Sequence, residues 1–244
     1  MATYLVINLA AVIIPFIFSF HRRLNFYKSW HAFWPAALIT AALFLFWDVF
    51  FTRWGVWGFT PKYLLGRSLL GLPVEEWLFF ICIPYACVFT YASLKKMDTH
   101  DFLSAQAGRI TFALTGVLIL VAVFNLDKAY TSVTFLLTAG FLLMHLIFIK
   151  PTYLSSFYFS YVILLFPFLL INGILTGSFL DGQVVWYNDS ENLGIRIFTI
   201  PIEDFIYAFL LILMNVTIYE ALLSKKEKQP DARTVKTSSI NIPV

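Results

Sequence analysis

Seven long apolar stretches constrain the fold of this chain more than any other feature. An α-helix needs about 17–25 largely apolar residues to cross a bilayer. The stretches cover residues 4–20, 32–51, 77–94, 110–126, 130–149, 153–175 and 205–223. Backbone polar groups must find partners within the protein in hydrocarbon, and the alternation typical of a membrane barrel is missing. The sequence therefore predicts an all-α, polytopic integral membrane protein with about seven transmembrane helices.

Composition excludes the main alternatives to a membrane protein. Hydrophobic residues make up 60% of the chain and charged residues 13%, against about a quarter charged residues in soluble domains. A soluble domain, a disordered chain and a disulfide-stapled module are therefore excluded. The net charge of +3 is too small and scattered for nucleic-acid binding. The N-terminal MATYLVINLA has no basic region before its apolar run, so we expect the first stretch to be retained as a span.

The positive charges predict the orientation in the membrane. Cytoplasmic loops carry an excess of Lys and Arg. Counted on alternate sides of the spans, 12 lie on one side and 5 on the other, out of 17. This split predicts an outside N-terminus and a cytoplasmic C-terminus, and we expect a bacterial cytoplasmic membrane. The larger group is Arg22, Arg23, Lys28, Lys95, Lys96, Arg109, Lys150, Lys225, Lys226, Lys228, Arg233 and Lys236.

An internal repeat organises the chain. A shift of 128 positions lays PVEEWLFF, residues 73–80, onto PIEDFIYA, residues 201–208. The copies are offset by four spans, an even number, so the halves run parallel and both motifs reach the same membrane face. We expect two parallel three-helix repeats joined by a connecting helix. The predicted units are residues 1–98 (first repeat), 99–128 (connecting helix), 129–224 (second repeat) and 225–244 (a polar C-terminal tail).

The repeated motifs place a pair of carboxylates at the head of a membrane helix twice. The four candidate catalytic residues are Glu75, Glu76, Glu203 and Asp204. Pro followed by acids is also a good helix start, so a capping role competes with a functional one. Ionisable groups in membrane helices are costly, and duplication with a second acid favours function. Desolvation and like charges raise a carboxyl pKa while a helix N-terminus lowers it, and the sequence leaves open which effect dominates.

The chain resembles the membrane lycopene cyclases of the heterodimeric and fused type, which are unrelated to the flavin-binding cyclases. The stretches that carry the resemblance are LGLPVEEWLFF at residues 70–80, WGVWGFTPKY at residues 54–63 and TIPIEDFIYA at residues 199–208. The chain looks like a single-chain fusion of the two small subunits. In the second motif Asp204 stands where the first has Glu76, which bears on whether the two halves have equal roles.

The resemblance implies acid-catalysed, non-redox cyclisation of the linear end groups of lycopene to β-ionone rings. An acid protonates the terminal double bond, an internal alkene attacks the cation, and a base removes a ring proton. Aromatic faces can stabilise the cation. The implied partners are lycopene or a related linear carotenoid, membrane lipid and other enzymes of the pathway, with no cofactor, metal or nucleic acid. The candidate substrate-binding residues are Trp57, Phe59, Phe79, Phe80, Trp186 and Tyr207.

Other interpretations stay open at this point. A small proton-coupled transporter also fits parallel repeats and membrane carboxylates, although it favours acids near the middle of the bilayer. A non-catalytic carotenoid-binding protein would tolerate neutral replacement of all four acids. A prenyltransferase would need paired Asp-rich motifs, and the chain offers only Asp98 and Asp101. Asp48, near the end of the second span, either joins the acid network or is an interfacial carboxylate.

Overall fold

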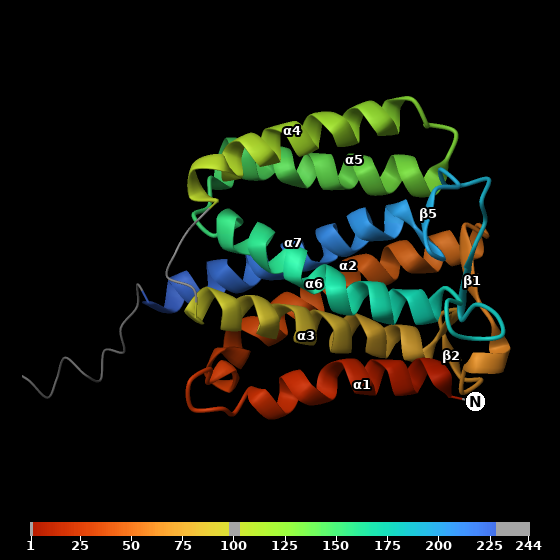
Figure 1. Cartoon of the computed structure of the whole chain (residues 1–244), viewed down its shortest axis with the longest axis horizontal. Helices are drawn as coiled ribbons and strands as arrows, with labels where there is room; N and C mark the ends of the chain where they lie inside the picture. Colours follow the sequence, from red (N-terminus) through yellow and green to blue (C-terminus); the bar gives the residue numbers. More distant parts are fainter. Residues whose placement is uncertain (1, 98–102, 228–244) are drawn as a thin grey trace, which may run out of the picture.

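The computed structural model describes residues 2–97 and 103–227, which form a bundle of seven α-helices (Figure 1). In this part of the chain, six helices are long and apolar enough to cross a membrane, and α1, with 16 residues, is shorter. The all-α, polytopic prediction is therefore confirmed. The helices are α1 (Thr3–Phe18), α2 (Trp30–Arg53), α3 (Val74–Met97), α4 (Ser104–Val123), α5 (Ala129–Met144), α6 (Leu154–Leu175) and α7 (Ile202–Glu227).

Short non-α elements complete the chain between these helices. A 3-10 turn, η1 (Phe26–Ser29), precedes α2, a second, η2 (Pro61–Tyr63), follows β1, and a π-helical turn, η3 (His145–Ile149), extends α5. Residues 228–244 of the predicted tail lie outside the described residues, as do Asp98 and Asp101.

The helices that carry the two acidic motifs begin in the same way. A two-residue hairpin, β2 (Ser68–Leu69) with β3 (Leu72–Pro73), leads directly into α3. A second hairpin, β5 (Arg196–Ile197) with β6 (Ile200–Pro201), leads into α7. The proline that ends each hairpin has no N–H to donate, and the acids that follow complement the positive end of the helix dipole. Both helices therefore start at the motif, and we call this end of the bundle the acid end.

A third strand pair joins distant parts of the chain at the acid end. Strand β1 (Trp57–Phe59) pairs antiparallel with β4 (Val185–Tyr187), with Gly58 opposite Trp186 at the centre. A Cβ atom on Gly58 would lie 2.4 Å from the Trp186 ring, so this position accepts only glycine without movement of the indole. The pair brings the two loops that precede the acidic motifs together.

The same spacing of 128 residues recurs in the backbone around both motifs. The N–H of Val74 donates to the carbonyl of Arg67, and the N–H of Ile202 donates to the carbonyl of Ile195, both at 3.0 Å. Leu70 and Phe198 occupy the left-handed region with φ of 55° and 56°. The pairing of β1 with β4 follows the same spacing. Adding 128 to the residue numbers of β1 gives those of β4, and the pair Trp57–Tyr187 then corresponds to the pair Val185–Phe59.

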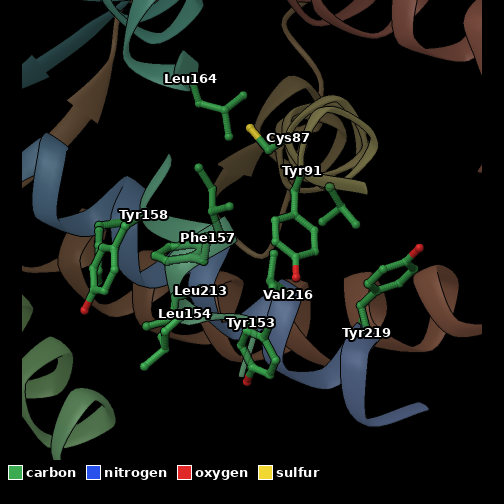
Figure 2. Packing of buried hydrophobic residues seen from close by; sticks show 14 of the residues in the cluster. Cys87, Tyr91, Tyr153, Leu154, Phe157, Tyr158, Leu164, Leu213, Val216 and Tyr219 are labelled. Carbon is green, nitrogen blue, oxygen red and sulfur yellow. The ribbon is translucent and has the colours of Figure 1, made fainter. Parts of the chain in front are cut away.

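The helices pack in a layered bundle around buried aromatic and aliphatic residues. Helix α4 lies at one edge against α5, and α1 lies at the other against α3 (Figure 1). Between them, α2 packs on α7 and α3 packs on α6. Figure 2 shows part of the core, in which Tyr91 of α3, Phe157 of α6 and Leu213 of α7 meet. This core lies beyond the acid end and holds the site-bearing helices in place.

Candidate active site

A cavity of about 520 Å³ begins among the carboxyl groups of the acid end and extends along the bundle. Its walls come from α1, α3, α6 and α7, with β1 and β4 at one end, and they are mostly apolar. On α3 the lining runs from Glu76 to Thr90, which is about 21 Å at 1.5 Å per residue. Ile14 and Leu170 line it and are 63% and 56% exposed. The cavity is therefore elongated and opens between α1 and α6.

Three buried carboxyl groups from three helices line this cavity at the acid end. They belong to Asp48 of α2, Glu76 of α3 and Asp204 of α7. Asp48 and Glu76 lie near enough to repel each other when both are ionised. Asp48 thus belongs to the acid network and is not an interfacial carboxylate. The described residues contain no group of three His, Cys, Asp or Glu arranged to hold a metal ion.

Tyrosine hydroxyls hold two of these carboxyl groups. Tyr4 of α1 donates to Oε2 of Glu76 at 2.5 Å. Tyr130 of α5 donates to Oδ1 of Asp204 at 2.5 Å. The other oxygen of Asp204, Oδ2, accepts from the amide of Asn172 at 2.6 Å and from the hydroxyl of Tyr187 at 2.9 Å. Three donors therefore surround Asp204, as suits an ionised carboxylate.

The first acid of each motif lies elsewhere. The Oε1 atom of Glu75 accepts from the backbone N–H of Leu65 at 2.5 Å. The Oε1 atom of Glu203 accepts from the N–H of Leu193 at 2.8 Å and from the Thr131 hydroxyl at 2.6 Å. Both side chains are fully buried and neither lines the cavity. Successive helical residues point about 100° apart. Here Glu75 and Glu203 turn away from the cavity and fasten the preceding loops.

Four of the six aromatic residues named from the sequence line the cavity. These are Trp57, Phe59, Phe79 and Tyr207. Phe80 is buried beside Phe44, with 6.1 Å between ring centroids. Trp186 lies over Gly58 and is 39% exposed. The structure therefore places Phe80 in the packing between helices and Trp186 on the strand pair.

Aromatic rings surround the carboxyl groups at the acid end. The ring of Trp57 lies 5.0 Å from that of Tyr130 and 6.0 Å from that of Tyr207, and Tyr130 stacks on Tyr187 at 5.8 Å. Burial raises the pKa of Tyr187 well above its usual value, and the adjacent Asp204 carboxyl adds to this shift. Tyr187 is therefore a neutral donor. The arrangement offers several π-faces to a cation.

Sequence reasoning missed the tyrosines that contact the acids. Tyr4 and Tyr130 stand in the first turns of α1 and α5. Their separation is 126 residues, two short of the repeat spacing, so the shift that aligned the motifs did not align them. Tyr187 lies in a loop strand with no motif of its own. The sequence feature that could have identified Tyr4 and Tyr130 is a tyrosine near the start of the first helix in each half.

Comparison with known proteins agrees with these motifs. A family model described as lycopene cyclase matches residues 1–94 and 127–222, well over half of the chain. The unmatched residues 95–126 include α4. No solved structure matches the chain significantly.

Three curated relatives are fungal proteins named bifunctional lycopene cyclase/phytoene synthase. The Podospora anserina protein is 30% identical over 101 residues, which is 41% of this chain and 16% of that protein. The Colletotrichum graminicola protein is 30% identical over 102 residues, or 41% and 17%. The Neurospora crassa protein is 33% identical over 54 residues, or 22% and 9%. The match thus covers less than a fifth of each relative. On the extent of the family match, the chain belongs to the lycopene cyclase family.

Proposed function

We propose that this protein is a carotenoid cyclase that converts the linear end groups of lycopene into β-ionone rings within the membrane. The observation that carries the proposal is the elongated apolar cavity with buried carboxyl groups and aromatic rings at one end. An extended hydrocarbon fits such a cavity, and its end group would lie among Asp48, Glu76 and Asp204. Family membership supports the same reaction class.

The proposed reaction is an isomerisation that needs no redox step. A proton adds to the terminal double bond and gives a tertiary cation. A second double bond of the same end group attacks this cation, which closes a six-membered ring. The ring cation then loses a neighbouring proton, so one proton enters and one leaves. Asp204, held by three donors, is suited to stabilise the cation and to receive that proton. The rings of Trp57 and Tyr207 supply stabilisation that does not trap the cation as water would.

The proposal includes a single site shared by the two halves, residues 1–98 and 129–224. Tyr4 and Glu76 line the cavity from the first half, and Tyr130 and Asp204 line it from the second. The recurrence of the same backbone hydrogen bonds at a spacing of 128 residues supports the pairing of the halves. In this arrangement Glu75 and Glu203 support the site through the loops, while Glu76 and Asp204 face the substrate.

The test is pigment analysis in bacterial cells that accumulate lycopene. The wild-type chain should convert lycopene to cyclic carotenoids, detected by liquid chromatography, and Glu76→Gln and Asp204→Asn should lose at least about 100-fold in conversion. Asp127→Asn is the matched control, because Asp127 is exposed and does not line the cavity. Unchanged lycopene with wild-type protein present in the membrane would contradict the proposal.

The same experiment separates the remaining alternatives. A carotenoid-binding protein without activity would retain lycopene unchanged with all variants. A proton-coupled transporter is disfavoured because Glu76 and Asp204 lie in the first turns of α3 and α7, at one end of the bundle.

A further inference from the structure

The three carboxyl groups of the cavity differ in how their oxygens are bonded and buried. Both oxygens of Asp204 accept hydrogen bonds, and Oε2 of Glu76 accepts one from Tyr4. Asp48 is different: its Oδ1 accepts from the indole of Trp57 at 2.5 Å and from the hydroxyl of Thr52 at 3.2 Å. Its Oδ2 is buried and has no partner.

A buried carboxyl oxygen without a hydrogen-bond donor is energetically unfavourable unless a proton or another donor satisfies it. Asp48 is only 1% exposed, and it lines the cavity. Leaving a buried acceptor unsatisfied is unfavourable, and a proton on that oxygen lowers the charge that must be buried. Such a proton has no acceptor in the described protein, so the substrate is the group that can take it.

The Oε1 atom of Glu76 also accepts no hydrogen bond in the described protein, but it is not among the fully buried oxygens. The other buried carboxyl oxygens without a partner do not compete for this role. They are Oε2 of Glu75 and Oε2 of Glu203, and neither residue lines the cavity. Among the described residues, Asp48 is therefore the cavity-lining carboxyl group with a buried oxygen free for a proton.

The acid is also present in only one half of the chain. A shift of 128 residues from Asp48 reaches Thr176, whose hydroxyl bonds Thr199 at 2.7 Å and which does not line the cavity. A threonine hydroxyl is far too weak an acid to protonate an alkene. The halves thus match in Glu76 and Asp204 but differ at this position.

We propose that Asp48 is the general acid of the reaction and that the molecule has one asymmetric catalytic centre. This inference rests on the proposed function. The proton on Oδ2 is transferred to the terminal alkene of the linear carotenoid, a C–H bond forms, and Asp48 is left as the carboxylate. The ring cation later loses one proton to the Asp204 carboxylate. The enzyme is restored when Asp204 releases that proton and Asp48 takes one up. Besides its ring contact with the substrate, Trp57 positions the acid, because its N–H holds Oδ1 and leaves Oδ2 free for the proton. Each turnover closes one ring, and the second end group must enter the same centre.

The test compares four variants of the full-length protein, Trp57→Phe among them, with lycopene in detergent or in membranes. Asp48→Asn keeps the shape of the side chain without an acidic proton. Asp48→Thr introduces the residue that the second half carries at the corresponding position. Asp127→Asn is the exposed control. For each variant we would measure the amount of folded protein, the lycopene bound, from the shift of its absorption spectrum, and the rate of ring formation.

We expect both Asp48 variants to bind lycopene within about threefold of wild type and to form rings at least about 100-fold more slowly, the usual share of a general acid. Trp57→Phe should slow the reaction less than the Asp48 variants do. It should also shift the pH profile, because the indole N–H no longer donates to Oδ1 of Asp48. Either Asp48 variant, folded and cyclising within threefold of wild type, would overturn the assignment while leaving the cyclase function intact. A wild-type protein that binds lycopene but forms no ring would instead overturn the proposed function.

Equal amounts of one-ring and two-ring products from the first moments of the reaction would contradict the single centre. We expect the one-ring product to appear first and then to decline as the two-ring product accumulates.

Discussion

At the scale of single residues, neighbouring acids in each motif take different positions. Glu76 and Asp204 line the cavity, whereas Glu75 and Glu203 bind backbone N–H groups of the loops. Adjacent helical residues point about 100° apart, so the two acids of a motif can contact different surroundings. Which acid faces inward depends on the neighbouring helices and loops.

The hydroxyl of Tyr130 is one of three donors to Asp204, so its removal should weaken the charge stabilisation at this carboxylate. A hydrogen bond to a charged group contributes about 1.5–3 kcal/mol, and Tyr130→Phe should slow ring formation by about tenfold or more. Tyr158→Phe is the matched control, because the Tyr158 hydroxyl bonds Thr111 and lies outside the cavity lining. Equal rates for both variants, measured by chromatography, would argue against the role of Tyr130.

Glu75 should matter for stability more than for chemistry. Glu75→Ala leaves the N–H of Leu65 without its acceptor, at a cost of about 1–3 kcal/mol in the free energy of unfolding. Glu75→Gln keeps a carbonyl acceptor and should fold and cyclise nearly as wild type. Thermal unfolding in detergent, with Glu203→Ala as the counterpart in the second half, measures the effect. A Glu75→Gln protein that folds normally but is inactive would place Glu75 in the chemistry.

At the scale of elements, the spans were predictable, and the cavity lining was predictable only in part. Long apolar runs predict the helices, because backbone polar groups in hydrocarbon must be hydrogen-bonded within the segment. Pro73 and Pro201 mark the starts of α3 and α7. The pairing of β1 with β4 could not be read from the sequence, because three-residue strands carry no periodic signal. That pairing brings Trp57 and Tyr187 together, so the loop contribution to the site stayed hidden.

The strand pair should be sensitive at its centre. Gly58→Ala places a Cβ 2.4 Å from the Trp186 ring, so the indole must move or the strands must separate. We expect a lower unfolding temperature and reduced cyclisation. Adding Trp186→Ala removes the ring and should restore most of both, which a double-mutant cycle would measure. A single variant as stable as wild type would show that the indole shifts freely.

At the scale of the whole molecule, the acid end corresponds to the side of the membrane with fewer basic residues. The helices α3 and α7 begin there and end at the opposite face, near Lys95 and Lys225. The excess of Lys and Arg at that opposite face predicts its cytoplasmic location. The reaction centre would then lie near the outer leaflet.

The orientation can be tested with reporter fusions. We expect a C-terminal fluorescent protein to be fluorescent and a C-terminal alkaline phosphatase to be inactive, because the C-terminus is predicted to be cytoplasmic. Phosphatase inserted after Asp127, in the turn between α4 and α5, should be active. The reverse pattern would indicate the opposite orientation in the membrane, with the carboxyl groups near the cytoplasm.

The opening of the cavity between α1 and α6 changes how the kinetics of this protein should be expressed. Exposed residues such as Ile14 and Leu170 line the opening, and under the proposed function an apolar carotenoid would reach it from the hydrocarbon phase. Encounter then occurs in two dimensions, and the relevant concentration is the mole fraction of substrate in lipid, not its amount per volume of water. Adding detergent or lipid at constant substrate would dilute that fraction and slow turnover without any inhibitor.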